Sequence, residues 1–166
     1  MNYPSFDSRD FRQALGQFPT GVTIITCKTS AGENVGMTAS SFNSVSLEPP
    51  LVLWSIAKGA WSLAAFAEAR HFAIHVLAAH QQELSNQFAR QGADKFHGIN
   101  TDEGLGGAPL LQDYCARFQC QMLHQYDGGD HLILVGRVLD FCSKPQAPLV
   151  FHSGRYARLE EAAVVI

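Results

Sequence analysis

A short segment near the start of the chain gathers side chains that suit an anionic ligand. Thr38, Ser40 and Ser41 place three hydroxyls within four residues, and an apolar run follows closely at 51–54. Hydroxyls and backbone N–H groups packed this tightly can hold a phosphate without a cluster of lysines. The plainer interpretation is that the three residues form the polar face of a hairpin strand.

A second segment, far away in the sequence, supplies a titratable group. Residues 127–131 are Asp-Gly-Gly-Asp-His, and a tight glycine turn of this kind brings a side chain to the rim of a pocket. Histidine titrates near neutral pH, which makes His131 the candidate for a reacting face, with a hairpin cap as its alternative. Together the two segments predict an anionic cofactor beside a titratable side chain.

The composition fits a single folded domain over residues 1–166. The chain is 46% apolar and 16% charged, which is typical of a globular protein. Its net charge is −3 and it has no Lys/Arg-rich run, so we expect no nucleic-acid partner. No apolar run approaches the roughly 20 residues of a membrane helix, and the first residues do not resemble a secretory signal. We therefore expect no membrane partner.

The cysteine and histidine patterns favour no metal site. The four cysteines are scattered without a Cys-x-x-Cys pair, and the seven histidines show no ligand motif. We expect buried or half-buried thiols in a reducing cytoplasm. Metal or haem binding is a weaker alternative.

The elements that must position these residues are mostly short strands. A short helix is expected after a cap at Asp7 or Ser8, and 19–21 ends it. Two further short helices are expected over 62–69 and 80–90. Strands are predicted over residues 22–27, 35–41, 42–47, 51–56 and 71–77, where β-branched and apolar residues recur.

The second half of the chain contains the longest predicted hairpin. Residues 92–113 are rich in glycine and lack a sustained period, so we expect a loop. Strands over 116–126 and 131–141 flank the Gly128-Gly129 turn, and a last strand covers 148–152. Many strands, hairpin turns and short helices predict a mainly β fold, an antiparallel barrel with peripheral helices. The absence of Gly-x-Gly-x-x-Gly argues against a Rossmann fold.

Seven segments occur in an order that is specific, although each is weak alone. They are Phe-Pro-Thr-Gly-Val-Thr at 18–23, Gly-Met-Thr-Ala-Ser-Ser-Phe at 36–42, Ser-Val-Ser-Leu-Glu-Pro-Pro-Leu-Val at 44–52, Phe-Ala-Ile-His-Val-Leu at 72–77, Gln81 with Leu84-Ser85 and Phe88-Ala89, Gly-Asp-His at 129–131, and Pro-Leu-Val-Phe-His-Ser-Gly-Arg-Tyr at 148–156. This ordered set resembles the flavin reductase-like family. The resemblance implies an FMN-binding split β-barrel, antiparallel and Greek-key-like, with peripheral short helices.

The resemblance also implies an activity. Members of this family use NADH or NADPH to reduce FMN or FAD by hydride transfer, and many supply free reduced flavin to a separate monooxygenase. They are typically homodimers, and we expect a partner chain to cover apolar strand faces that carry Phe118, Met122, Val135 and Val138. The alternatives are an FMN-binding electron carrier and a non-catalytic flavin or nucleotide binder. The sequence does not decide between NADH and NADPH, or between FMN and FAD.

By the same resemblance, most candidate residues are assigned to the flavin. Residues 38–41 would line its ribityl chain and phosphate, Lys58 would pair with the phosphate, and His131 would face the nicotinamide as the catalytic residue. His75 stands where the family usually carries asparagine and would bond the flavin through its ring. The cofactor-binding candidates are Thr38, Ala39, Ser40, Ser41, Ser55, Ile56, Ala57, Lys58, Ser62, His75, Gln81, Ser85, Phe88, Lys95, Phe96, Gly129, Asp130 and Tyr156.

Several of these residues also have a plainer, purely structural interpretation. Gly-Ala-Trp at 59–61 departs from the small polar residues expected there, which puts the local phosphate contacts in question. Trp54 and Trp61 either border the ring or belong to the core. The structural interpretation is a loop position for Lys58 and Lys95, a helix face packed on the barrel for Gln81, Ser85 and Phe88, and core packing for His75.

Overall fold

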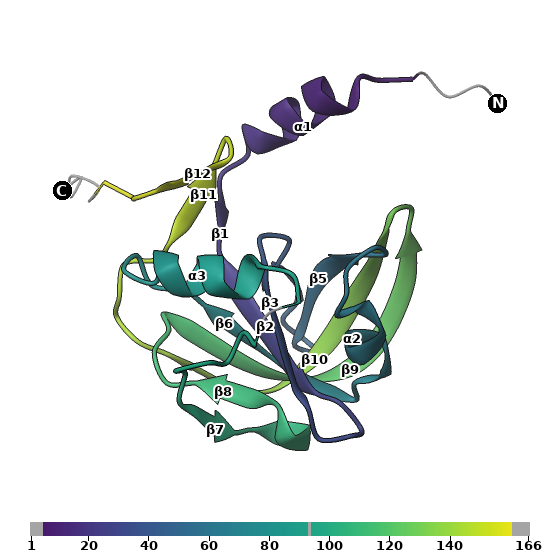
Figure 1. The fold of residues 1–166 in the computed structure, drawn as a ribbon, viewed down its shortest axis with the longest axis vertical. Helices are drawn as coiled ribbons and strands as arrows, with labels where there is room; N and C mark the ends of the chain where they lie inside the picture. The colour runs from purple at the N-terminus through teal and green to yellow at the C-terminus, as the bar shows by residue number, and fades with distance from the viewer. Residues whose placement is uncertain (1–4, 93, 161–166) are drawn as a thin grey trace.

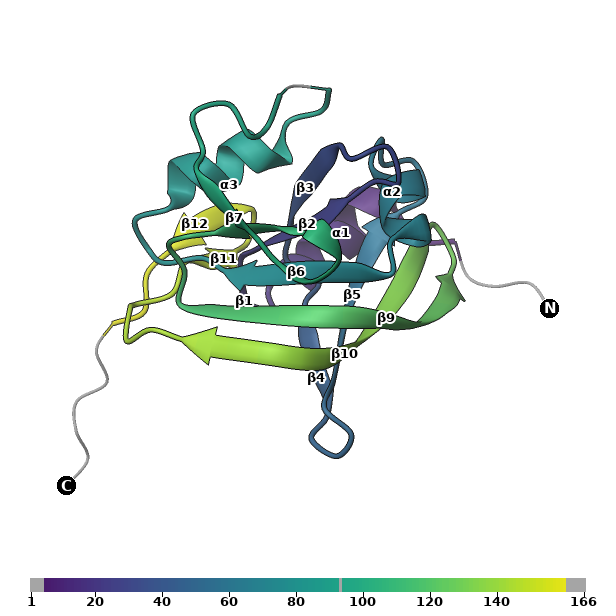
Figure 2. The same cartoon turned by 90° about the horizontal axis from the view of Figure 1, so that it is seen from below.

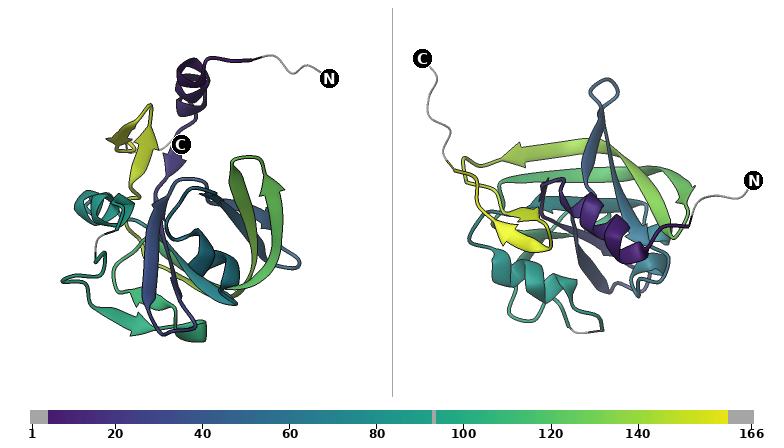
Figure 3. Two further views of the ribbon diagram at one scale, coloured as in Figure 1. Left: turned by 45° about the vertical axis from the view of Figure 1, so that its right-hand side comes forward. Right: turned by 90° about the horizontal axis from the view of Figure 1, so that it is seen from above.

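The computed structural model describes residues 5–92 and 94–160, and one antiparallel sheet dominates it (Figure 1). Its seven strands lie in the order β3-β2-β6-β9-β10-β5-β4. Their bounds are β2 Thr23–Lys28, β3 Asn34–Ala39, β4 Asn43–Ser46, β5 Leu51–Ala57, β6 His71–Val76, β9 Ala116–Gly128 and β10 His131–Ser143. The sheet is strongly curved, so that its two ends approach one another and leave α2 (Leu63–Glu68) between them (Figure 3). The predicted mainly β architecture is confirmed.

The long hairpin β9–β10 forms one wall of this barrel. Figure 2 shows the two strands running side by side across the molecule, and they pair from His131 and Gly128 to Ser143 and Ala116, with register shifts at 135–136 and 138–140. Both strands extend beyond their predicted ends. The hairpin is therefore rigid where it joins the sheet, and its turn projects the Gly-Asp-His segment beyond the barrel rim.

The smaller elements lie around the main sheet. They are α1 Ser8–Gly16, β1 Thr20–Gly21, α3 Gln82–Ala89, β7 Thr101–Glu103, the 3-10 turn η1 Leu105–Gly107, β8 Pro109–Leu111, β11 Val150–His152 and β12 Arg155–Ala157. Among the described residues, no helix combines the length and the apolar character that crossing a membrane requires.

Two predictions about these smaller elements are wrong. The segment 92–113 is not simply a loop, because β7 and β8 pair within it as a two-stranded sheet. A further strand, β12, follows Gly154 and pairs with β11. Each of these strands has only three residues, which is too short for a period of two to be recognised in a sequence.

The core fills the concave side of the sheet. In β5, Val52, Trp54 and Ile56 are buried and alternate with half-buried neighbours, as a strand with one face on a core requires. Trp54 packs edge-on against Phe66 of α2 and Phe72 of β6, with ring centroids 4.9 and 6.1 Å apart. Trp54 is thus a core residue, and α2 is held in the barrel by aromatic contacts.

Three of the strand residues expected to face a partner chain lie on this same concave side. Phe118, Met122 and Val138 pack against the core cluster around Trp54, and Val135, next to Leu134 in β10, is also buried. The prediction that these four form an exposed face is wrong. The curvature of the sheet turns the face of the first three inward.

An arm stands away from the barrel and consists of α1, β1, β11 and β12 (Figure 1). Asp7 caps α1 as predicted, because its Oδ1 accepts from the backbone N–H of Arg9 at 2.8 Å and of Asp10 at 3.0 Å. The helix buries none of its residues. Its apolar face is therefore exposed over the described part of the chain.

Candidate functional site

The barrel is open along a seam between β3 and β5. Strand β5 pairs with β10 over its whole length, from Leu51 to Ala57, whereas β4 reaches its other side only up to Leu53. Strand β3 has β2 on one side and no strand on the other within the described chain. Both facing edges therefore keep backbone donors and acceptors that no ladder uses.

One side chain closes the seam at a single point. The hydroxyl of Ser41 donates to the carbonyl of Ser55 at 3.0 Å and accepts from its N–H at 2.9 Å. Ser41 thus acts as a substitute for a strand neighbour. Beyond it, the edge of β5 at Ile56 and Ala57 continues toward Lys58 without a strand partner on that side.

A chain of hydroxyls fixes α3 beside the seam. Thr38 Oγ1 donates to the carbonyl of Ser85 at 2.6 Å. Tyr156 Oη donates to Asn86 Oδ1 at 2.8 Å and lies 2.9 Å from Ser85 Oγ, which leaves Ser85 as the donor in that contact. Each of these three hydroxyls donates its hydrogen to a group of the protein, so Thr38, Ser85 and Tyr156 together position α3 between β3 and β12.

A hollow of about 130 Å³ opens between β3, the start of α2 and the end of α3. The buried Ser62 contributes a hydroxyl that donates only to the weak acceptor Met37 Sδ, at 3.6 Å. Lys95 Nζ donates to the Gly36 carbonyl at 3.1 Å, and partial burial lowers the pKa of this lysine. The lining residues are Met37, Thr38, Ala60, Trp61, Ser62, Phe88, Ala89, Arg90, Gln91, Gly92 and Lys95.

The hollow depends on close packing behind it. Phe88 is fully buried and meets Phe96 edge-on at 5.0 Å. A Cβ atom at Gly36 would lie 2.5 Å from the Phe88 ring, so only glycine fits at this position of β3. Phe88 and Phe96 therefore support Lys95 and set how deep the hollow is.

The hairpin turn presents His131 on a network of its own. Its Nδ1 donates to Asp130 Oδ1 at 2.6 Å, and this bond lowers the pKa of the Asp130 carboxyl. The other ring nitrogen, Nε2, takes no part in this bond. Asp130 belongs to the turn rather than to the strand, so its side chain can reach the ring. Gly129 adopts a positive φ of 81° in this turn, which the sequence anticipates.

Lys58 is tied to the same turn. Its Nζ lies 3.0 Å from Asp127 Oδ2, and its backbone N–H donates to the Asp130 carbonyl at 2.8 Å. Asp127 Oδ1 also accepts from the Gly129 N–H at 2.9 Å, and these contacts lower the pKa of Asp127. The structure thus places Lys58 on the hairpin rather than in the hollow where the phosphate contact was predicted, because the Asp127 carboxylate attracts it.

Two predicted flavin contacts are contradicted by burial. His75 is fully buried, its Nδ1 donates to the Ile24 carbonyl at 3.1 Å, and its Nε2 accepts from the Leu111 N–H at 3.1 Å. Burial lowers the pKa of His75 to about 3, so the ring is neutral and has no nitrogen left for a ligand. Gln81 likewise spends its amide on the Ala78 N–H and the Asp113 carbonyl.

Ile56 is also absent from the seam, because its side chain points into the core and it pairs with Leu132 of β10. Arg90 is a lining residue that the sequence interpretation missed. Arg90 directly follows α3, five residues before Lys95. A second cation so near Lys95 in the sequence was the signal that could have indicated a shared anion site.

These features agree with the comparison with known families. The flavin reductase like domain matches residues 15–160. The chain belongs to this family. A flavin reductase domain thus spans nearly the whole chain, as the resemblance implied.

Several proteins named as flavin reductases are similar in sequence. The chain is 47% identical over 152 residues to the FMN reductase (NADH) SmoA of Agrobacterium fabrum, covering 92% of this chain and 86% of that protein. It is 41% identical to HsaB of Rhodococcus jostii, the reductase subunit of a flavin-dependent monooxygenase, over 94% of this chain and 80% of the relative. Against a probable flavin reductase of Rhizobium meliloti, also 41% identical, it covers 50% of a longer protein.

Solved flavin reductases share the fold. The NADH:FAD oxidoreductase SgcE6 of Streptomyces globisporus, determined in complex with NAD and FAD fragments, superposes with a TM-score of 0.88 at 37% identity. The comparison covers 97% of this chain and 99% of that one. Flavin reductase PheA2 gives a TM-score of 0.85 at 38% identity, covering 94% and 100%. The split barrel of this flavin reductase chain is therefore the family's own architecture.

Proposed function

We propose that this chain is an NADH-dependent flavin reductase whose flavin lies in the seam between β3 and β5. The observation that carries the proposal is the open seam itself, with a basic hollow beside β3 and α3 and with His131 paired with Ala57 at the end of β5. Relatives named as NADH-dependent FMN reductase and as reductase subunits of flavin-dependent monooxygenases support the activity.

The donor set of the seam suits a flavin. The pyrimidine end of the ring carries alternating donors and acceptors, and backbone groups along the edges of β3 and β5 that no ladder uses can pair with it. The phosphate tail requires donors and positive charge, and Ser62, Arg90 and Lys95 supply both in the hollow. Ser40 is exposed near the end of β3 and can serve the ribityl hydroxyls. The site thus binds ring and tail by different means.

The protein contributes binding and orientation to the reaction. The flavin, when bound, supplies the hydride acceptor, and the nicotinamide supplies the donor. His131, held through Nδ1 by Asp130, directs its other nitrogen away from the turn and can orient the carboxamide of a nicotinamide. The Lys58–Asp127 pair keeps the turn close to the end of β5. Proximity and orientation account for most of the acceleration expected of such a site.

We infer three further properties of the protein. It delivers reduced flavin to a separate monooxygenase component, as the names of its relatives indicate for those proteins. It is a homodimer, which the exposed apolar face of α1 supports. Its free cysteines fit a reducing compartment such as the cytoplasm; burial raises the pKa of Cys27 and Cys120 to about 12, which keeps both thiols unreactive.

An anaerobic mixing experiment tests the activity. The protein is combined with NADH and an excess of FMN, and the visible absorbance of oxidised flavin is followed. We expect bleaching of many equivalents of FMN per protein chain. A protein that bleaches no more than one equivalent is an electron carrier, and one that bleaches none with any pairing of flavin and nicotinamide contradicts the proposal.

A further inference from the structure

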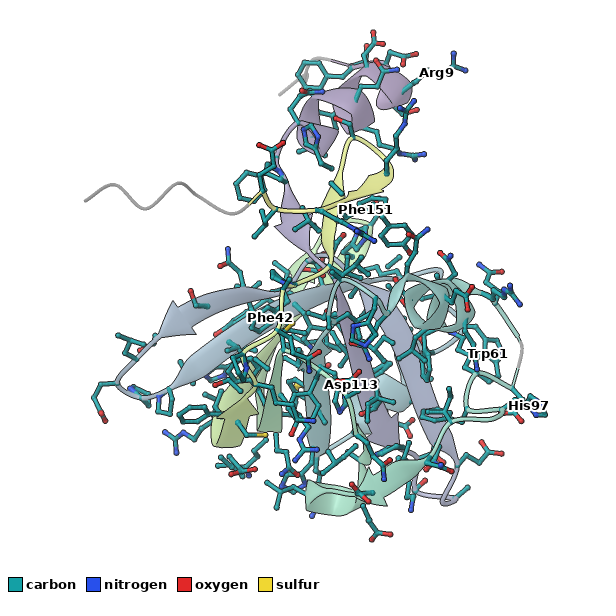
Figure 4. All side chains as sticks on the ribbon, turned by 90° about the vertical axis from the view of Figure 1, so that its left-hand side faces the viewer. Arg9, Phe42, Trp61, His97, Asp113 and Phe151 are labelled. Atoms are coloured by element: carbon teal, nitrogen blue, oxygen red, sulfur yellow. The ribbon has the colours of Figure 1, made fainter. Side chains whose placement is uncertain are left out.

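An exposed indole borders the basic hollow. Trp61 is 74% exposed, and it lies at the edge of the molecule beside the loop that follows α3 (Figure 4). The chain's other tryptophan, Trp54, is completely buried. Large aromatic side chains contribute most when their apolar surface is covered, so an exposed indole at the rim of a binding site is a candidate ligand contact.

Trp61 lines two adjoining depressions of opposite character. The first is the hollow of about 130 Å³, where Arg90 and Lys95 provide positive charge. The second, of about 230 Å³, is lined by the acidic side chains Glu33 and Asp94. Lys95 and Trp61 border both, so a ligand that occupied the two depressions together would lie beside the indole.

The charges predict which part of a ligand occupies each depression. Phosphates are attracted by the cations of the first depression and repelled by the carboxylates of the second. Carboxylates and the Asn34 amide oxygen instead accept hydrogen bonds from an amino group, such as the one that adenine carries. A planar base lying between the two groups would stack on Trp61.

We propose that Trp61 stacks on the adenine of a dinucleotide whose phosphates lie at Arg90 and Lys95. The proposal deepens the proposed function and rests on it. Two ligands of the reaction carry this adenylate group, a dinucleotide flavin and the nicotinamide dinucleotide. The flavin is the expected one, because its phosphate tail is proposed to lie at these same cations, and the nicotinamide dinucleotide could occupy them only when the flavin does not. Base stacking on an aromatic side chain is worth about tenfold in affinity.

A binding experiment isolates the stacking from catalysis. Because Trp54 is buried, quenching of the exposed tryptophan emission reports on Trp61. The probe is ADP, which carries adenine and two phosphates but neither flavin nor nicotinamide. We expect ADP to quench the wild-type emission saturably, and to give a smaller response in W61F because only Trp54 remains to emit. Calorimetry should show that ADP binds W61L about tenfold more weakly than the wild type. Unchanged ADP affinity in W61L overturns the proposal.

A kinetic comparison then identifies which dinucleotide is bound. The ratio of kcat/KM for FAD to that for FMN is measured in the wild type, W61L and W61F, and so is the ratio for NADH to reduced nicotinamide mononucleotide. A fall of about tenfold in the first ratio for W61L assigns the adenylate to the flavin, and a fall in the second assigns it to the nicotinamide dinucleotide. We expect W61F to preserve the ratios, because a phenyl ring still stacks.

The control is F141L, which changes an equally exposed aromatic residue on β10, 69% exposed. It should alter neither ratio. If both ratios are unchanged in W61L as well, the adenylate assignment is wrong. If the wild type reduces no flavin at all, the proposed function fails, whereas the ADP measurement still decides whether Trp61 binds an adenine nucleotide.

Discussion

At the scale of single residues, His131 is the side chain with which the proposed reaction is best tested. We expect His131→Ala to lower kcat/KM for NADH about tenfold while FMN affinity is retained, since we propose that the imidazole contacts the nicotinamide. Asp130→Asn should lose less, because the amide oxygen still accepts from Nδ1. The measurement is steady-state kinetics with either substrate varied, together with FMN binding by fluorescence. Equal losses toward NADH and FMN would contradict the assignment.

His75 makes a separate prediction about acid stability. Its pKa is about 3 in the folded protein and near 6.5 when unfolded, so only the unfolded chain takes up a proton between these values. The contribution of His75 to the free energy of unfolding is therefore fully present above pH 6.5. It falls by up to about 1.4 kcal/mol per pH unit as the pH decreases toward 3. Urea unfolding at pH 7, 6, 5 and 4 measures this slope. We expect the His75→Gln protein to be less stable at pH 7 but to lose stability less steeply with falling pH, because it lacks His75 and keeps every other titrating group of the wild type. Identical slopes in the two proteins would show that His75 does not cause the acid destabilisation.

At the scale of elements, the contact of α3 with β3 depends on a glycine. Gly36→Ala would place a Cβ 2.5 Å from the buried Phe88 ring, so the ring and the helix that carries it must shift. We expect a loss of about 1–3 kcal/mol in the free energy of unfolding and weaker flavin binding. Gly59→Ala is the control, since a Cβ there meets nothing within 4 Å. A Gly36→Ala protein as stable as the Gly59→Ala protein would show that α3 adapts without cost.

The elements also show where sequence reasoning succeeds. The apolar run at 51–56 predicts a strand, and the structure puts Trp54 in the core because every second residue of β5 faces it. The Gly128-Gly129 hairpin and the Asp7 cap follow from local rules, and both are confirmed. Hydroxyls at 38–41 mark the seam, because the β3 edge on which they lie is set by the hairpin with β2.

What sequence reasoning missed depends on distant partners. Burial keeps His75 neutral, and its ring nitrogens bond the Ile24 carbonyl and the Leu111 N–H, which no local pattern connects to it. Lys58 was assigned to a phosphate, yet its partner is Asp127, on a hairpin 69 residues away. A side chain's type fixes what it can bind, whereas the folded chain decides which group is nearest.

At the scale of the whole molecule, α1 requires a partner. A nine-residue helix is marginal alone, and α1 buries none of its residues against the barrel. Phe11, Leu15 and Phe18 are 54%, 60% and 74% exposed on one face, whereas Gln13 on the opposite face lines a hollow toward the Ser153–Gly154 turn. An apolar stripe of this kind marks an interface, and a second copy of the chain is its simplest occupant.

The prediction is that Phe11→Asp combined with Leu15→Asp converts a dimer into a monomer. Each buried carboxylate would cost several kcal/mol in an apolar interface, which exceeds what the contact of one helix contributes. Sedimentation at low micromolar concentration measures the mass, and the Tm of the wild type should rise with protein concentration whereas that of the variant should not.

Gln13→Asp introduces the same charge on the face turned away from the stripe and should remain dimeric. A wild type that sediments as a monomer would mean that α1 is held by something other than a second copy. A double variant that stays dimeric would instead place the interface on the barrel, whose apolar strand residues are already engaged by its own core.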